Sequence, residues 1–187
     1  MRKYLLTVVL GLVAMVTNAQ TFLGLPLSGS INEFHKQLIA KGFTLTHNDN
    51  DARFYDGTLG SSPIRVLVLN TPTTKQVAKG VIWFYEKSSF VDLEYDFDDK
   101  KKLFVEKYGE PTDCFNYFAK PYYRGDGYEM TAVRVGKYSN VCFWQMTNGF
   151  SVSLEISKEQ KVKAAFENNE NMKLLKEERE KKLSDGL

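Results

Sequence analysis

Residues that carry out catalysis or bind metals are scarce in this chain. Its 187 residues include only two histidines and two cysteines. His35 and His47 lie too far apart in the sequence, and are too poorly accompanied by other ligand residues, for a zinc motif. The sequence contains no G-x-S-x-G nucleophile motif, no phosphate-binding loop and no dinucleotide fingerprint. We therefore predict a protein that is not an enzyme and that uses no cofactor and no metal.

An excess of charge of one sign is also absent. The chain carries 25 basic and 23 acidic residues, a formal net charge of +2. Arg2 and Lys3 belong to the predicted leader described next, and without them the two signs balance. No overall field attracts the protein to nucleic acid or to an anionic membrane surface. We predict that its partners do not include nucleic acid.

Long hydrophobic runs are missing after the first residues. Residues 4–16 are mostly apolar, follow Arg2 and Lys3, and precede a small residue, Ala19. A helix of this length spans about 20 Å, short of the ~30 Å hydrocarbon core of a bilayer. The pattern is typical of a cleaved signal peptide over residues 1–19. It predicts export to the periplasm or the medium, without stable insertion in the membrane.

The two cysteines allow three interpretations. In an oxidising compartment, Cys114 and Cys142 form a natural disulfide pair, and this is the interpretation we favour. Two buried free thiols are the second, since cysteine is among the most buried residue types. A catalytic cysteine–histidine pair is the third, and nothing around either cysteine indicates an activated thiol.

The first part of the predicted mature chain is expected to be one helix followed by four strands. Ser30 and Glu33 form a capping box, and Gly42 ends the helix, which covers residues 31–41. The strand-like segments are 43–47, 52–59, 64–70 and 77–86. The last of these is apolar on both faces, so it is either buried on both sides or offers one face to a partner.

The same order of elements follows in the second part. A helix is predicted for residues 90–108, with strands at 113–118, 128–135, 140–146 and 150–157. The Asn148-Gly149 turn joins the last two. Half of the residues from 158 to 187 are charged, which indicates a charged helix that either packs on its own domain or binds a partner.

The repeated order divides the chain into four predicted segments: the signal peptide 1–19, a first α+β repeat 20–87, a second repeat 88–157 and the C-terminal charged helix 158–187. The predicted fold class is α+β, with two tandem units that each combine a helix with a four-stranded antiparallel meander. Together the units form a curved sheet surface.

Two short segments carry a resemblance. Residues 107–111, Lys-Tyr-Gly-Glu-Pro, end the second helix, and residues 22–27, Phe-Leu-Gly-Leu-Pro-Leu, precede the first. With the order of helix and meander, they resemble a family of small exported proteins of unknown function. Its architecture is similar to the β-lactamase-inhibitor-protein-like tandem fold. The resemblance covers most of residues 22–157 and implies a joint curved sheet, which in the inhibitor proteins grips a partner protein. No functional residue carries over.

Aromatic residues are the remaining candidates for a binding site. Tyrosine and tryptophan are favoured interface anchors because they combine a large area with a polar tip. The candidate binding residues are Tyr117, Tyr122, Tyr123, Tyr128, Trp144 and Trp83. We predict a non-catalytic module that binds an envelope or periplasmic protein. The alternative is a small-ligand or glycan-binding protein in which the same rings form a stacking platform near Asn116, Arg124 and Asp126. Ordinary core packing competes with both.

Overall fold

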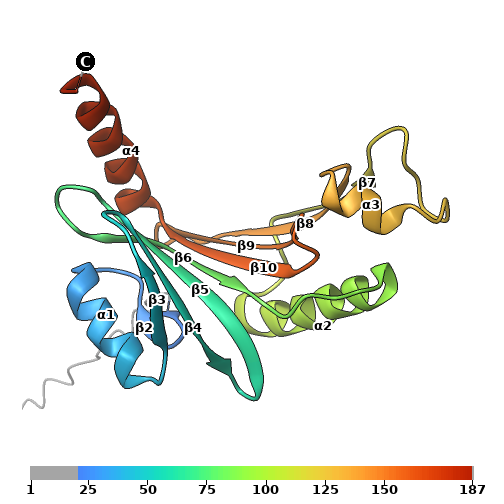
Figure 1. Cartoon of the computed structure of the whole chain (residues 1–187), viewed down its shortest axis with the longest axis horizontal. Coiled ribbons are helices and arrows are strands. Elements are labelled where there is room, and N and C mark those ends of the chain that lie inside the picture. Colours follow the sequence, from blue (N-terminus) through green and yellow to red (C-terminus); the bar gives the residue numbers. More distant parts are fainter. Residues whose placement is uncertain (1–20, 187) are drawn as a thin grey trace, which may run out of the picture.

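The computed structural model describes residues 21–186 and has an α+β fold built on one large antiparallel sheet (Figure 1). The sheet has eight strands in the order β3-β4-β5-β6-β10-β9-β8-β7. Their bounds are β3 (Thr44–Asn48), β4 (Ala52–Leu59), β5 (Ser62–Asn70), β6 (Val77–Trp83), β7 (Asp113–Phe118), β8 (Tyr138–Gln145), β9 (Phe150–Ile156) and β10 (Val162–Asn168). The predicted fold class is confirmed, including the C-terminal helix. The predicted signal peptide lies outside the described residues.

Four helices and a small hairpin complete the described part of the chain. They are α1 (Ile31–Ala40), α2 (Phe90–Tyr108), α3 (Glu129–Arg134), α4 (Asn169–Ser184), and the two-stranded sheet of β1 (Thr21–Phe22) and β2 (Leu25–Pro26). Ser30 caps α1 as the sequence predicts, because its hydroxyl accepts from the Asn32 amide at 3.2 Å. Figure 1 shows α1 and α2 on one side of the sheet and α4 rising on the other.

The two halves of the sheet repeat one plan. α1 precedes the meander β3-β4-β5-β6, and α2 precedes β7, β8, β9 and β10. The last strand of each half lies at the centre, where β6 and β10 pair antiparallel with Val81 opposite Ala165. The two halves therefore form a single continuous sheet, with β3 at one edge and β7 at the other.

One predicted strand is a helix in the structure. The sequence predicts a strand over residues 128–135, after the turn at 124–127, but this segment contains α3. Ala132 and Val133 are both buried. A strand would turn these adjacent side chains to opposite faces of a sheet, whereas a short helix packs both against its neighbours. Tertiary packing overrides the local preference here.

Part of the predicted C-terminal helix is a strand. Residues 158–187 include β10 before α4 begins at Asn169. Val162, Ala164 and Phe166 alternate into the core, while Lys163 and Glu167 point to the other face and form ion pairs. The high charge of this segment conceals its alternation. The second meander therefore extends to Asn168.

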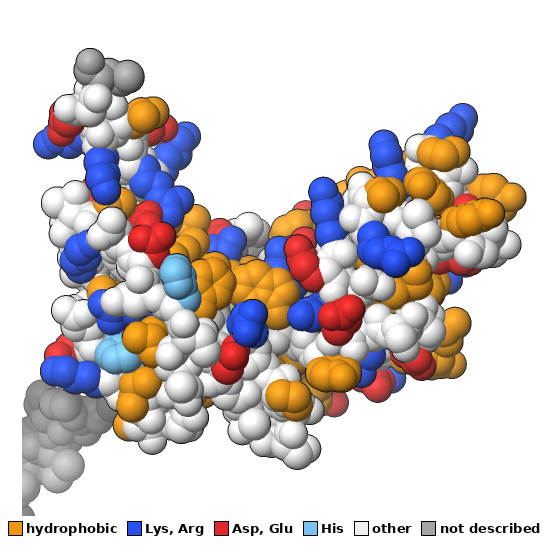
Figure 2. All heavy atoms as spheres, viewed as in Figure 1, with side chains coloured by type: hydrophobic (Ala, Val, Ile, Leu, Met, Phe, Trp, Pro, Cys, Tyr) orange, Lys and Arg blue, Asp and Glu red, His pale blue; other side chains and the backbone are white. Residues whose placement is uncertain are grey.

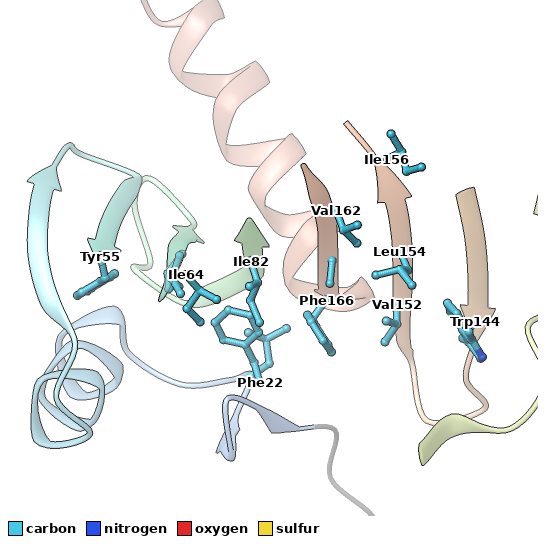
Figure 3. Packing of buried hydrophobic residues seen from close by; sticks show 14 of the residues in the cluster. Phe22, Tyr55, Ile64, Ile82, Trp144, Val152, Leu154, Ile156, Val162 and Phe166 are labelled. Atoms are coloured by element: carbon cyan, nitrogen blue, oxygen red, sulfur yellow. The ribbon is translucent and has the colours of Figure 1, made fainter. Parts of the chain in front are cut away.

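The core joins both halves beneath the central strands (Figure 3). The ring of Phe22, from β1, lies 5.3 Å from that of Phe166 and 6.3 Å from that of Phe34 in α1. Gly80 leaves room for it, since a Cβ at that position would stand 2.7 Å from the Phe22 ring. The N-terminal hairpin thus fills the core under the β6–β10 pair.

Candidate functional site

One face of the sheet packs on α1 and α2, and we call the other the open face. Figure 2 shows the molecule hollowed on the upper side, between α4 and the part of the chain around α3. The strand registers define which side chains share the open face, because residues paired across neighbouring strands project to the same side. Three transverse rows of side chains result.

The middle row is a mostly apolar band across six strands. It runs through Phe54, Leu67, Val81, Ala165, Ser153 and Phe143. Ala165 and Ser153 are small, and beside them lies a hollow of about 160 Å³ that Phe143 also lines. Val81 and Ala165, in the middle of the band, are buried at 4% and 5% exposure. The accessible apolar surface of the band therefore lies toward its two ends, at Phe54 and Leu67 on one side and Phe143 on the other.

Ion pairs flank the apolar band on both sides. In one flanking row Arg65 Nε lies 2.9 Å from Asp56 Oδ1, and Lys163 pairs with Glu155. In the other, Lys79 pairs with Glu167. The hydrogen bond from Arg65 lowers the pKa of Asp56. Because these pairs join opposite charges across neighbouring strands, the rows leave the open face close to neutral.

Trp83 and Tyr117, two of the six predicted binding residues, lie on the open face. Trp83 lies between Arg65 and Lys163 in the first flanking row and is half-buried. It lines a hollow of about 630 Å³ with Arg65 and Tyr85. Tyr117, on β7, is 56% exposed. These two side chains mark opposite halves of the face.

Two further aromatic side chains accompany Tyr117. Phe115 and Phe143 lie on the open face at 49% and 37% exposure, and their ring centroids are 6.4 Å apart in an edge-to-face arrangement. Phe143 and Trp144 are neighbours in β8, and alternation along the strand sends one to each face. That alternation is the sequence signal that separates the exposed ring from the buried one.

Trp144 does not lie on the open face. Its side chain is 2% exposed, within the core that joins α2 to the sheet, and its Nε1 donates to the Gly109 carbonyl at 2.8 Å. A partner therefore has no access to this ring in the folded protein. We remove Trp144 from the candidate binding residues.

The remaining three tyrosines belong to the segment between β7 and α3. Tyr123 and Tyr128 are 65% and 63% exposed, and the Asp126 carboxylate accepts from both of their backbone amides, at 3.0 and 2.7 Å. Tyr122 is half-buried and packs against the core. A turn clamped by Asp126 thus displays Tyr123 and Tyr128 at one end of the molecule, apart from the rows of the open face.

This segment is tied to α2 by a charged network. Arg124 donates to both oxygens of Glu94, at 2.6 and 2.8 Å, and the Tyr138 hydroxyl donates to Glu94 at 2.7 Å. The Arg124 guanidinium holds the pKa of Glu94 below its usual range, with a smaller contribution from the Tyr138 hydroxyl. Burial, with the Glu94 charge, raises the pKa of Tyr138. The Arg-Gly-Asp-Gly sequence at 124–127 is therefore part of an anchored turn.

Cys114 and Cys142 are joined by a disulfide, which confirms the favoured interpretation of the pair. They are register partners on β7 and β8, with their Cα atoms 4.2 Å apart. The bond fastens the edge strand β7 to the rest of the sheet. It excludes both the free-thiol interpretation and a cysteine nucleophile.

A polar hollow of about 370 Å³ lies near Tyr117. Its lining includes Asn140, Glu155, Lys158 and Lys163. Within residues 21–186, His, Cys, Asp and Glu side chains form no group of three or more that is able to hold a metal ion. No helix in that range is both long enough and apolar enough to cross a bilayer.

Comparisons of this chain with protein-family models, with curated proteins and with solved structures found no match.

Proposed function

We propose that the protein is an exported, non-catalytic module that binds another protein through the open face of its sheet. The observation that carries the proposal is the apolar band flanked by ion-paired rows. Protein interfaces commonly combine an apolar centre with a polar rim, and a few aromatic side chains supply most of the binding energy. The aromatic side chains of the open face that are available for that role include Phe54, Trp83, Phe115, Tyr117 and Phe143.

The electrostatics of the face favour a partner of low net charge. The charged side chains of the flanking rows already neutralise one another across the strands. A highly charged partner would have to separate these ion pairs. Their desolvation costs free energy, and a face without net charge offers no electrostatic attraction to offset that cost. The partner surface is therefore expected to be apolar at its centre and mixed in charge around it.

The proposal also includes export of the protein from the cytoplasm. The predicted signal peptide places the protein in the periplasm or outside the cell, and a disulfide is compatible with such an oxidising environment. The expected partner is accordingly an envelope or periplasmic protein.

The test uses two tyrosines that are similarly exposed on different surfaces. Tyr117 is 56% exposed on the open face, and Tyr95 is 67% exposed on α2. A partner captured from an envelope extract is purified, and its affinity is measured by calorimetry. Tyr117→Ala and Trp83→Ala should each weaken binding about tenfold or more, whereas Tyr95→Ala should leave the affinity unchanged. Equal affinities for all three variants would contradict the proposal.

The polar hollow favours a second candidate function, the binding of a small ligand or glycan. An aromatic ring beside amide, carboxylate and ammonium groups suits a sugar, and Tyr117, Asn140, Glu155 and Lys158 all line this hollow. The two functions are separable, because Lys158 lies at the hollow and Trp83 lies outside it. A glycan that raises the melting temperature of the wild type and of Trp83→Ala, but not of Lys158→Ala, would favour the second function.

A further inference from the structure

The two edges of the sheet differ in how they are protected from pairing with another strand. β3, at one edge, has a register shift between Leu45 and His47. β7, at the other, pairs with β8 over six successive positions without a shift. Bulges, lysines and prolines are devices that keep edge strands from adding a further strand. β7 contains no lysine and no proline.

β7 is exposed on both of its faces. Cys114 and Asn116 point to the side of the sheet that carries α1 and α2, Phe115 and Tyr117 point to the open face, and all four residues are exposed. α2 packs on β9 and β10, nearer to the centre of the sheet. Phe118, at the end of the strand, contacts Phe90 of α2, with ring centroids 5.8 Å apart. Residues 113–117 are exposed, and no further strand of the described chain pairs beyond β7.

The register shows which backbone groups of β7 face outward. The 4.2 Å separation of the Cys114 and Cys142 Cα atoms marks a narrow pair, in which the two residues do not hydrogen-bond to each other. The next residues alternate, so the backbone N–H and C=O groups of Phe115 and Tyr117 hydrogen-bond to β8. Ala119 fits this alternation, because its amide donates to the Lys137 carbonyl. Consequently Cys114, Asn116 and Phe118 direct their N–H and C=O groups away from the sheet.

We propose that a second copy of this chain pairs with β7 along this edge, so that two β7 strands run antiparallel across a two-fold axis. An alignment centred on Asn116 places Phe115 opposite the partner's Tyr117, and Tyr117 opposite the partner's Phe115. Two aromatic cross-strand pairs form on the open face, where both rings are exposed in the single chain. The interface is isologous and closes on itself.

Charge also favours a second copy as the occupant. β7 begins with the acidic Asp113, and the basic Lys120 follows its last residue by two positions. Antiparallel alignment brings the acidic end of each strand toward the basic end of the other. A parallel arrangement would bring like charges together, so the strand is complementary to itself only in the antiparallel sense.

The test is sedimentation equilibrium of the oxidised protein over a concentration series, with three variants. Asn116→Pro removes an N–H that points outward, so no hydrogen bond to β8 is lost. Edge strands tolerate proline at positions whose N–H points away from the sheet. Asn116→Lys places two like charges opposite each other at the centre of the pair. Thr44→Lys adds the same charge to an exposed residue on the other edge strand, β3, and is the matched control.

The wild type is expected to form a dimer, and both Asn116 variants should raise its dissociation constant at least about tenfold, while Thr44→Lys leaves it unchanged. Circular dichroism melting and the absence of titratable thiols establish that each variant is folded with its disulfide intact. If Asn116→Pro does not fold, the effect of Asn116→Lys on the dissociation constant is the test. A wild type that remains monomeric would overturn the proposal. So would a dimer unaffected at Asn116, or one weakened equally by Thr44→Lys.

Discussion

The two halves of the sheet follow the same plan but are held together by different means. In the first half, Tyr55, Val66, Val68 and Leu38 are fully buried beneath α1 and the N-terminal hairpin. In the second half, packing is equally close at β9 and β10 but is lost toward β7, five of whose six residues are exposed. A disulfide and the Arg124–Glu94–Tyr138 network hold that outer part. The comparison shows that cross-links replace packing where the helix layer ends.

The largest effect on stability is expected from truncating Trp144, a core residue of β8, the strand to which the disulfide fastens β7. Trp144→Ala should lower the free energy of unfolding by about 3–5 kcal/mol, because it opens a large cavity and leaves the Gly109 carbonyl without its donor. Urea unfolding measures the change. Trp83→Ala, which alters a half-buried ring on the open face, is the control and should cost clearly less. Similar losses in the two variants would mean that β8 is no better packed than the open face.

The next largest effect is expected from removing the disulfide. The double variant Cys114→Ala, Cys142→Ala frees a loop with a sequence separation of 28. The entropic model then predicts a loss of about 3.5 kcal/mol. Hydrogen exchange should accelerate most in β7, by local opening, and least in β5, whose Val66 and Val68 are fully buried. Equal acceleration in the two strands would contradict the contrast between packed and cross-linked regions.

A smaller and pH-dependent effect is expected from the charged network. The folded pKa of Glu94 is lower than its ordinary value of 4.5. Its stabilisation is therefore fully present above about pH 4.5 and is lost as the pH falls through the folded pKa. Glu94→Gln should cost about 1 kcal/mol at pH 7, a value discounted because Arg124 is largely exposed.

At pH 3 the gap between the wild type and Glu94→Gln should be narrower. Urea unfolding at the two pH values measures both gaps, and Glu106→Gln, an exposed position on the same helix, is the control. A gap that is equally wide at both pH values would show that the charge of Glu94 does not hold this region.

The smallest effect on stability is expected at the open face. Tyr117→Ala should change the free energy of unfolding by less than about 0.5 kcal/mol, because the ring is exposed and lies outside the core. Thermal melting beside Tyr95→Ala provides the measurement. A loss as large as that of Trp144→Ala would place Tyr117 among the residues that hold the second half together.

The sequence predicted the elements whose local signals agree with their environment. The capped helix at Ser30 and the meander of the first half are examples, because hydrophobic period and turn residues point the same way. The predictions of a strand at 128–135 and of a helix over the residues of β10 were wrong, because tertiary contacts determine the secondary structure of both segments. Ala132 and Val133 pack together as a helix, and the charged residues of β10 are accommodated by ion pairs with Glu155 and Lys79 on neighbouring strands.

The candidate site was predictable only in part, for a similar reason. Alternation along β7 assigns Phe115 and Tyr117 to one face, as the structure has them. Whether a ring such as Trp144 faces the core or a partner depends on which side the helices cover, and a single strand does not encode this. The rows of the open face also depend on register between strands far apart in the chain, such as β6 and β10.

The central position of β10 has a consequence for how the protein is made. During translation β6 is synthesised long before β10. Until β10 is available, β6 is an unpaired edge of the first half of the sheet and β9 is an unpaired edge of the second half, and the two halves share no strand pairing. Joining the halves is therefore among the last events available to the nascent chain. A termination codon just before Val162 would remove only a small share of the polypeptide yet split its architecture in two.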